Sequence, residues 1–333
     1  MVSRILPVLS RGRQFTSPYA PRFLFLGAQV TGRYVKHLKY PLFVMGKGAN
    51  PSIAQLRMCG EAVERVSINV EGANNVWRGH TLLRGETIEI LPSVFFAAPY
   101  FIRSHGCACH NHVDAASTSA IAELWERRAV QDWWQGSCCL RILSQSHPQF
   151  EELSSYVSSA RQGAVEMRET LFFLISGHRP VDVALALSRD RDGKQAALAF
   201  AAGTGSLSAL FRRAFEELLS VELETADLHR ARLDGDVVVP GSNRHLVQER
   251  QRVLHKRFST ELQGVVPFEF DQVTATRQSS TEELLRASED AGAPIWLIDM
   301  THKEIGVPTI RAVFERPDLN PFVYYDDDEI LPL

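Results

Sequence analysis

The sequence lacks long apolar runs: none of its 333 residues lies in a stretch of 18 consecutive apolar residues. A helix that spans a bilayer needs about 20 such residues, so we expect no transmembrane segment and no membrane partner. Cysteine is also scarce, with five residues in all, of which Cys138 and Cys139 are adjacent. An odd number in this arrangement does not fit a disulfide framework, so we expect a reducing compartment, the cytoplasm.

Two widespread nucleotide-binding motifs are absent as well. The chain has no GxxxxGK[ST] loop, and no GxGxxG fingerprint follows an expected strand. The sequence therefore excludes a P-loop and a dinucleotide-binding fold. We expect no nucleic-acid partner either, and any nucleotide site has to be built from other residues.

Acidic residues are missing from the first part of the chain. No Asp or Glu precedes Glu61, whereas nine Lys and Arg residues do. We interpret residues 1–40 as a basic N-terminal arm that meets an acidic partner or a nucleotide. The opposite end, residues 317–333, contains the run Asp326-Asp327-Asp328-Glu329 and is expected to be an acidic C-terminal tail.

Three segments share an order of features: an extended stretch, a Gly-containing turn and a helix that carries carboxylates. The expected helices span 52–68, 114–134 and 206–223, with Asp114 and Ser206 as N-caps of the last two. Residues 66–98 alternate like antiparallel strands, and 181–187 and 196–201 read as further strands. We predict an α+β fold of repeated strand–Gly turn–helix units, with helices packed on mixed or antiparallel sheets.

The later part of the chain gives fewer signals. Residues 230–280 are polar and basic and contain Pro240-Gly241, which favours a mobile insertion. A helix is expected from Thr281, as its cap, to Gly292. Residues 295–299 are expected to be a buried strand, and 305–314 a pair of strands.

Glutamates recur three residues apart on two of the expected helices. Glu61 with Glu64, and Glu123 with Glu126, each share one helix face. Such like charges repel unless a cation intervenes, and Mg²⁺ prefers carboxylate and phosphate oxygens. Arg127 and Arg213 on the second and third helices are suited to phosphate. The alternative is a solvated helix face with ordinary ion pairs, and the pattern alone leaves it open.

Three ordered blocks of these residues resemble the YcaO family. Gly46-Lys47-Gly48 through Gly60-Glu61-Ala62-Val63-Glu64-Arg65 is similar to its GKG…GEAxER block, and Ser104-His105-Gly106 through Glu123-Leu124-Trp125-Glu126-Arg127 to its SNG…ALxExxER block. Gly203-Thr204-Gly205 through Arg213-Ala214-Phe215-Glu216-Glu217 resembles the third block, GxGxH…RAxxE. Asp299-Met300-Thr301 through Ile305-Gly306-Val307-Pro308 is similar to a late DxT…IGxP turn, so the likeness extends over residues 40–314, the bulk of a YcaO-like catalytic domain expected at 41–316.

This resemblance implies that the chain binds ATP and Mg²⁺ and activates a backbone amide of a precursor peptide. The amide oxygen would be phosphorylated and lost, which closes Cys, Ser or Thr into an azoline; some relatives make thioamides or amidine rings instead. It further implies that Mg²⁺ is held by Glu61, Glu64, Glu123, Glu126 and Glu217. Lys47, Arg127, Arg213 and Glu217 would bind the nucleotide.

Three positions depart from the family pattern. Arg57 replaces a Ser, Ser220 replaces a Gln and His105 replaces an Asn. Arg57 is interpreted either as an additional phosphate ligand or as a side chain that fills the pocket and impairs nucleotide binding. A non-catalytic scaffold subunit is therefore an alternative to the enzyme.

The ends of the chain bear on its partners. The tail contains a single late proline rather than the Pro-rich end common in azoline-forming relatives, and no leader-binding domain precedes the first block. We expect a separate leader-binding or sulfur-transfer partner protein, a flavin dehydrogenase in the same complex, and a homo- or hetero-oligomer.

One other cluster holds soft metal ligands. Cys107, Cys109 and His110 lie within six residues of His105 and His112. Their spacing is not that of a zinc finger, so a structured turn is favoured over a transition-metal site or a Cys–His nucleophile.

Overall fold

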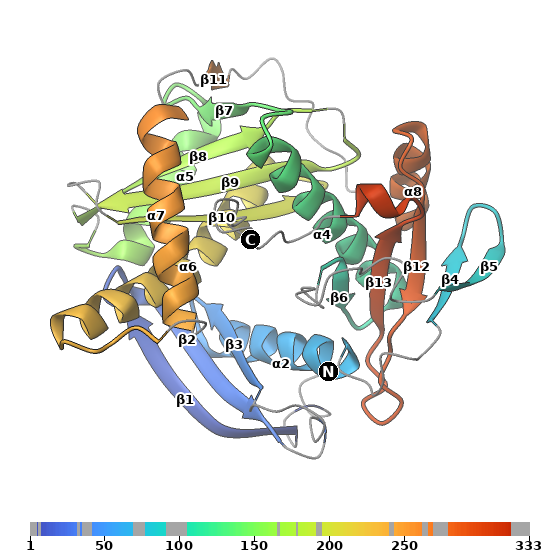
Figure 1. The fold of residues 1–333 in the computed structure, drawn as a ribbon, viewed down its shortest axis with the longest axis horizontal. Coiled ribbons are helices and arrows are strands. Elements are labelled where there is room, and N and C mark those ends of the chain that lie inside the picture. The colour runs from blue at the N-terminus through green and yellow to red at the C-terminus, as the bar shows by residue number, and fades with distance from the viewer. Residues whose placement is uncertain are drawn as a thin grey trace.

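The computed structural model describes most of the chain in one α+β body (Figure 1). The described residues are 5, 8–31, 34, 42–68, 77–90, 105–164, 167–177, 179–190, 195–239, 243–261, 266–268 and 279–320. The Pro240-Gly241 pair, residues 101–104 and the acidic run at 326–329 therefore lie outside them. No helix in these ranges combines the length and the apolarity that crossing a membrane requires.

The N-terminal sheet is antiparallel and contains β1 (Leu9–Ser17), β2 (Ala20–Val30) and β3 (Phe43–Gly48). Helix α2 (Pro51–Ile68) packs on one face, where Val44 meets Met58 and Ala62. The contact is so close that a Cβ on Gly46 would lie 1.9 Å from the carbonyl oxygen of Ala54. Gly46 is therefore required by helix packing on a strand and not by a turn.

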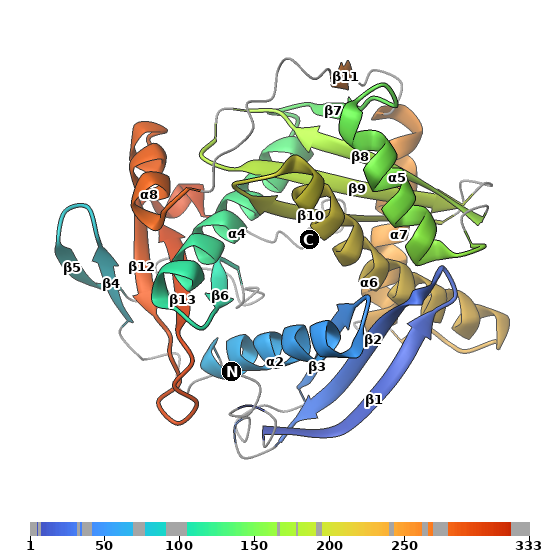
Figure 2. The ribbon, with the colours of Figure 1, turned by 180° about the vertical axis from the view of Figure 1, so that it is seen from behind.

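The middle sheet has the order β10-β9-β8-β7-β11, and only the β11–β7 pair is parallel. Its strands are β7 (Leu140–Leu143), β8 (Arg168–Ile175), β9 (Asp182–Asp190), β10 (Ala196–Gly203) and β11 (Val266–Phe268). Helices α5 (Pro148–Arg161) and α6 (Leu207–Leu233) cover one face, and α7 (Asn243–Glu261) lies against α6 and β10 (Figure 2). Alternate alanines of β9 and β10 face α6, which allows this long helix to lie close to the sheet.

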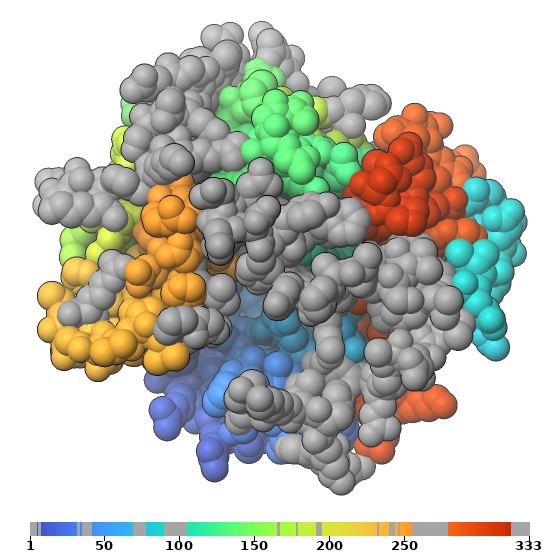
Figure 3. Space-filling view, in the orientation of Figure 1, coloured from blue at the N-terminus to red at the C-terminus, as the bar shows by residue number. Residues whose placement is uncertain are grey.

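The third sheet is antiparallel, with the order β5-β4-β12-β13-β6. It contains β4 (Trp77–Thr81), β5 (Glu86–Ile90), β6 (Cys107–Cys109), β12 (Ile295–Asp299) and β13 (Thr309–Phe314). Helix α8 (Thr281–Asp290) contacts β12, and a short 3₁₀ helix spans Pro317–Leu319. The β4–β5 hairpin, cyan in Figure 3, stands at the edge of the molecule.

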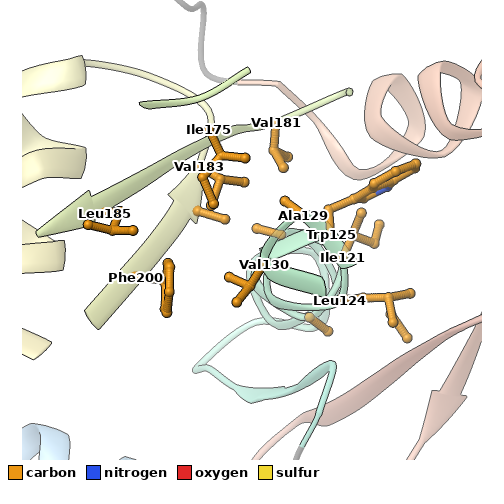
Figure 4. Close-up of a cluster of buried hydrophobic side chains, with 14 of the residues drawn as sticks. Ile121, Leu124, Trp125, Ala129, Val130, Ile175, Val181, Val183, Leu185 and Phe200 are labelled. Carbon is orange, nitrogen blue, oxygen red and sulfur yellow. The ribbon is translucent and has the colours of Figure 1, made fainter. Parts of the chain in front are cut away.

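Helix α4 (Val113–Trp134) lies between the second and third sheets in both ribbon views (Figures 1 and 2). Figure 4 shows Ala129 and Val130 on the side of α4 that faces Phe200 and Val183 of the middle sheet. Leu124 and Trp125 point away from that sheet, on the other side of the helix. Because apolar side chains surround α4, its charged residues are costly to bury unless they are paired or bind a cation.

The predicted α+β fold with helices on antiparallel sheets is confirmed. The repeated unit is not: only the third segment follows the expected order, ending β10 at Gly203, turning through Thr204-Gly205 and opening α6. In the first, Gly46 and Gly48 lie inside β3. In the second, Gly106 precedes a strand, β6, that the sequence did not predict because it has only three residues.

Two predicted caps and one strand pair are wrong. His112 occupies the N-cap of α4 with extended backbone, which places Asp114 in the first turn. Ser280 caps α8 in a reciprocal capping box with Glu283, so Thr281 is the first helical residue. Residues 305–314 contain a single strand, β13, which begins at Thr309, and Ile305 and Val307 before it pack into the core cluster of α2. Ser206 does precede α6 and accepts from Ala209 N at 3.4 Å, as predicted.

Two predicted segments contain more regular structure than expected. The described part of residues 1–40 includes the hairpin β1–β2, which pairs with β3. Within 230–280, α6 continues to Leu233 and α7 spans Asn243–Glu261, because no Gly or Pro interrupts α6 before Gly235. The division of the chain at residues 40 and 316, and the mobility of 230–280, stay predictions.

Candidate functional site

The two glutamates of α2 are each held by a backbone amide of a neighbouring strand. Glu61 Oε2 accepts from Met45 N in β3 at 2.8 Å, and Glu64 Oε1 accepts from Cys109 N in β6 at 3.0 Å. Burial raises the pKa of both carboxyls, that of Glu64 to about 7. The two amide hydrogen bonds act in the opposite direction, because they stabilise the charged form of each carboxyl. Each carboxylate is thus oriented through one oxygen, and the other oxygen of Glu61, Oε1, lies 3.6 Å from Arg65 Nη2.

Helix α4 contributes Glu123, Glu126 and Arg127. Arg127 is also close enough to α6 to lower the pKa of Glu217. Glu126 is only 8% exposed, and its pKa is raised by burial. Burial, together with the charges of Glu64 and Glu126, raises the pKa of Glu123 to about 8, although Arg127 opposes the shift. Arg127 Nη1 lies 3.5 Å from Glu126 Oε1, and its Nη2 lies 3.6 Å from Glu123 Oε1.

The α6 side of the site is already paired with a cation of the chain itself. Lys47 Nζ, from β3, donates to Glu217 Oε2 at 2.5 Å and to Ser220 Oγ at 2.9 Å. Although burial would raise it, the pKa of Glu217 is lowered by Lys47, Arg57 and Arg127. Ser220, one of the departures from the family pattern, therefore holds the ammonium group of Lys47.

Arg213 lies one turn before Glu217 on α6. A Cβ on Gly203 would come within 3.2 Å of its Nη1, so the glycine at the end of β10 leaves room for the guanidinium. The charge of Arg213 lowers the pKa of Glu126. This side chain is exposed and thus available to an anion.

The carboxylates of the three helices lie near enough to shift one another's pKa values. Glu64 raises the pKa of Glu123, and Glu217 raises those of Glu126 and Glu61, which requires these groups to lie near one another. The structure brings together eight of the nine predicted site residues: Glu61, Glu64, Glu123, Glu126, Glu217, Lys47, Arg127 and Arg213. Their roles as metal or nucleotide ligands stay predictions.

Arg57 is engaged at the edge of this group of side chains. Its Nη1 forms an ion pair with Glu216 and donates to the carbonyl oxygen of Lys47 at 3.1 Å. Tyr156 Oη donates to the other oxygen of Glu216 at 2.6 Å. Arg57 thereby links α2 to α6, and its predicted role as a phosphate ligand stays untested.

Sequence reasoning missed several contributors. The amides of Met45 and Cys109 carry no side-chain signal, and β6 is too short to recognise. Arg311 was visible in principle, because it is a lone charge in the apolar strand β13. It is 1% exposed, and burial lowers its pKa to about 10, against the charges of Cys107 and Glu123. His105 is also buried, and desolvation, with Arg127 and Arg311, lowers its pKa well below the usual value.

The cysteines near the second block lie in a strand. Cys107 and Cys109 belong to β6, which pairs with β13, and the Cys109 thiol donates to the carbonyl oxygen of Gly60 at 3.3 Å. Burial raises the pKa of both thiols, which disfavours a thiolate nucleophile.

In the parts of the chain that the structure describes, no three His, Cys, Asp or Glu side chains are placed to hold a metal ion alone. Mg²⁺ usually takes one or two carboxylates and completes its shell with phosphates and water. The pairs on α2 and α4 have raised pKa values and lie beside Arg65 and Arg127, and their role as such a partial set stays a prediction.

Comparisons with known proteins address the family and the fold of the chain. The sequence profile of one family, described as YcaO cyclodehydratase, ATP- and Mg²⁺-binding, matches residues 75–316. Among solved structures, the chain is similar to YcaO from Methanopyrus kandleri bound with AMPPCP and Mg²⁺, with a TM-score of 0.67, 15% identity, and coverage of 94% of this chain and 87% of that one.

A second solved structure is a heterocyclase in complex with substrate and cofactor. Its TM-score is 0.64 at 16% identity, and the likeness covers 95% of this chain but 50% of that one, so this chain spans half its length. At such identities the likeness shows the fold alone. No curated protein matches the sequence.

Proposed function

This chain belongs to the YcaO family, and from that premise we propose that it activates backbone amides of a ribosomally made peptide by ATP-dependent phosphorylation, closing Cys, Ser or Thr into an azoline. The family description also confirms the predicted cofactors, ATP and Mg²⁺. The choice of azoline over thioamide, the partner proteins and the site residues are our proposal.

One observation carries the proposal: carboxylates from α2, α4 and α6 share a space with Lys47, Arg127 and Arg213. Phosphoryl transfer needs positioning and charge neutralisation more than covalent chemistry from the protein. In our proposal Glu61, Glu64, Glu123, Glu126 and Glu217 hold Mg²⁺, and the three cations bind phosphate oxygens. Mg·ATP, when bound, supplies the phosphoryl group that makes the amide oxygen a leaving group.

The azoline ring closes in two steps, addition and elimination. The side-chain sulfur or oxygen of the peptide residue adds to the carbonyl carbon of the preceding amide. The thiol or hydroxyl loses its proton in this addition. The former carbonyl oxygen takes the γ-phosphoryl group and leaves as phosphate, and the nitrogen loses its proton as the C=N bond forms. The peptide loses one water, and ATP becomes ADP and phosphate. The chain's contribution is to hold the phosphates in line with that oxygen.

The proposal also includes the cellular compartment and the partner protein. All five cysteines are free thiols, which supports the reducing cytoplasm as the location. We propose that a separate leader-binding protein delivers the precursor peptide.

Mass spectrometry of the peptide product tests the proposal. The chain is incubated with Mg·ATP, the precursor peptide and the partner encoded beside it. We expect each modified residue to lose the mass of one water, and Glu61→Ala and Glu126→Ala to abolish the loss. Replacement of oxygen by sulfur would instead establish thioamidation. Full modification by both variants would overturn catalysis at this site and favour the scaffold alternative.

A further inference from the structure

The N-terminal sheet is open over part of one face. Helix α2 covers the face that carries Val44 and Gly46. Because side chains alternate along a strand, Phe43, Met45 and Lys47 point to the other face. Lys47 is only 8% exposed, whereas Phe43 is 66% exposed. This second face is therefore covered near Lys47 and open to solvent at the other end of β3.

Five residues form the open part of this face. In the antiparallel register Gly27 of β2 lies between Arg13 of β1 and Met45 of β3, and Gln29 lies opposite Phe43. Directly opposite residues share a face of the sheet. Arg13 and Phe43 are exposed, and the other three residues are half-buried. We call Arg13, Gly27, Gln29, Phe43 and Met45 the open surface.

The open surface adjoins the glutamate site. The N–H of Met45 donates to Glu61 at 2.8 Å, and Lys47, two residues further along β3, donates to Glu217. Two residues of a strand span about 7 Å, so Phe43 lies about 13 Å from Lys47 along the strand. A peptide with one amide in the site can therefore cover the open surface with its next few residues.

The charge of this region has one sign. Arg13 is exposed, and so is Arg11, which lies in the bulge of β1 beside it. No Asp or Glu occurs in the chain before Glu61, so the sheet has no carboxylate of its own. Guanidinium groups bind carboxylates through paired N–H donors, and the side chains of Phe43 and Met45 favour apolar contacts. The chemistry of the open surface thus suits a ligand that is both acidic and apolar.

We propose that the open surface binds an extended segment of the precursor peptide, with a peptide carboxylate at Arg13 and an apolar side chain on Phe43. The proposal rests on the proposed function, because it takes the reacting amide to lie beside Lys47 and Glu61. The acidic partner predicted for the basic N-terminal residues is then the peptide itself. The separate leader-binding protein delivers this peptide, and the open surface aligns the part of it that enters the site.

Steady-state kinetics with two peptides test the proposal in the complete reaction mixture with Mg·ATP and the partner protein. One is the precursor peptide, and the other has each Asp and Glu replaced by Asn and Gln. Arg13→Gln and Phe43→Ser should each raise the KM for the precursor peptide about tenfold and leave kcat and the KM for ATP unchanged, because they remove binding but touch no reacting atom. The KM increase caused by the peptide substitutions should be about tenfold smaller in Arg13→Gln than in the wild type, because a direct contact is lost only once.

Two exposed positions provide matched controls. Arg22, on the same hairpin, donates to the neutral side chain of Gln162. Leu82 is 62% exposed in the β4–β5 turn, on the opposite side of the molecule (Figure 1). Arg22→Gln and Leu82→Ser should leave the KM for the peptide unchanged.

Four outcomes would overturn the proposal. If the wild type modifies the peptide but Arg13→Gln and Phe43→Ser keep its KM, or the effects of Arg13→Gln and of the peptide substitutions simply add, the peptide lies elsewhere and the proposed function stands. If the two variants change only the oligomeric state in light scattering, the open surface binds a second copy of the chain. If the wild type modifies no peptide, the proposed function fails as well.

Discussion

The two sides of the glutamate site differ in their electrostatics. On α2 and α4, burial and mutual repulsion raise the pKa values of Glu64 and Glu123 to about 7 and about 8. On α6, Lys47 and nearby arginines lower the pKa of Glu217. The α2–α4 carboxylates are therefore the less fully neutralised, although Arg65 and Arg127 lie 3.5–3.6 Å from them, whereas Glu217 on α6 accepts directly from Lys47. We infer that Mg²⁺ binds first between α2 and α4, and that the α6 side mainly positions phosphate.

The largest expected effect comes from removing a carboxylate on the α2–α4 side of the site. Glu123→Gln should lower peptide-dependent ATP turnover by about 100-fold, because loss of a metal contact weakens Mg²⁺ binding. Initial rates of ADP release over a range of Mg²⁺ concentrations measure this. Glu217→Gln should shift the Mg²⁺ dependence less than Glu123→Gln does; an equal shift would remove the distinction between the two sides. Glu282→Gln, an exposed glutamate paired with Arg286 on α8, is the control.

The pH dependence gives the next effect. Mg²⁺ has to displace protons from Glu64 and Glu123, so the affinity for Mg·ATP should rise about tenfold between pH 7 and pH 8 and level off above that. A flat profile in a binding titration would show that these carboxyls ionise normally.

The same two carboxyls should make the stability of the metal-free chain fall as pH rises, whereas they make the affinity for Mg·ATP rise. Their pKa values are raised above the ordinary 4.5, so the unfolded chain releases these protons first, and the melting temperature should fall as pH rises from about 5 to 8. Added Mg²⁺ should reverse the fall. Glu64→Gln should flatten it in calorimetric scans without Mg²⁺, and an unchanged slope in that variant would assign the fall to other groups.

Lys47→Met tests the other side. The variant leaves Glu217 without the ammonium group bound at 2.5 Å, and the KM for ATP should rise about tenfold, since a charge-assisted contact to phosphate is lost. Lys303→Met, in an exposed turn, should leave KM unchanged. A loss confined to thermal stability would show that Lys47 only neutralises Glu217.

Arg57→Ser should have the smallest effect. The Arg57 side chain is 39% exposed and pairs with Glu216, which keeps its hydrogen bond from Tyr156 when Arg57 is replaced, and ion pairs with an exposed partner contribute about 0–1 kcal/mol. The KM for ATP should change by less than about threefold, as it should for Arg212→Ser, which removes an equally exposed arginine from its pair with Glu152. A tenfold rise specific to Arg57→Ser would restore it as a phosphate ligand.

The same comparison explains what the sequence could predict. The sequence could place the i, i+3 glutamates and the following arginine on the helices α2 and α4, because helical periodicity is local. The anchoring amides of Met45 and Cys109 could not be predicted, since strand pairing between β6 and β13 joins residues about 200 positions apart in the chain. Gly46 was recognised, but its physical reason, the close approach of α2, depends on tertiary packing.

Calorimetric titration of the chain with ATP, with and without Mg²⁺ and in two buffers of different ionisation enthalpy, tests the central claim most directly. We predict tight binding only when Mg²⁺ is present, release of protons at pH 7, and loss of both in Glu123→Gln. Equal binding of ATP without Mg²⁺, or unchanged binding in that variant, would contradict a carboxylate-held Mg·ATP site between these three helices.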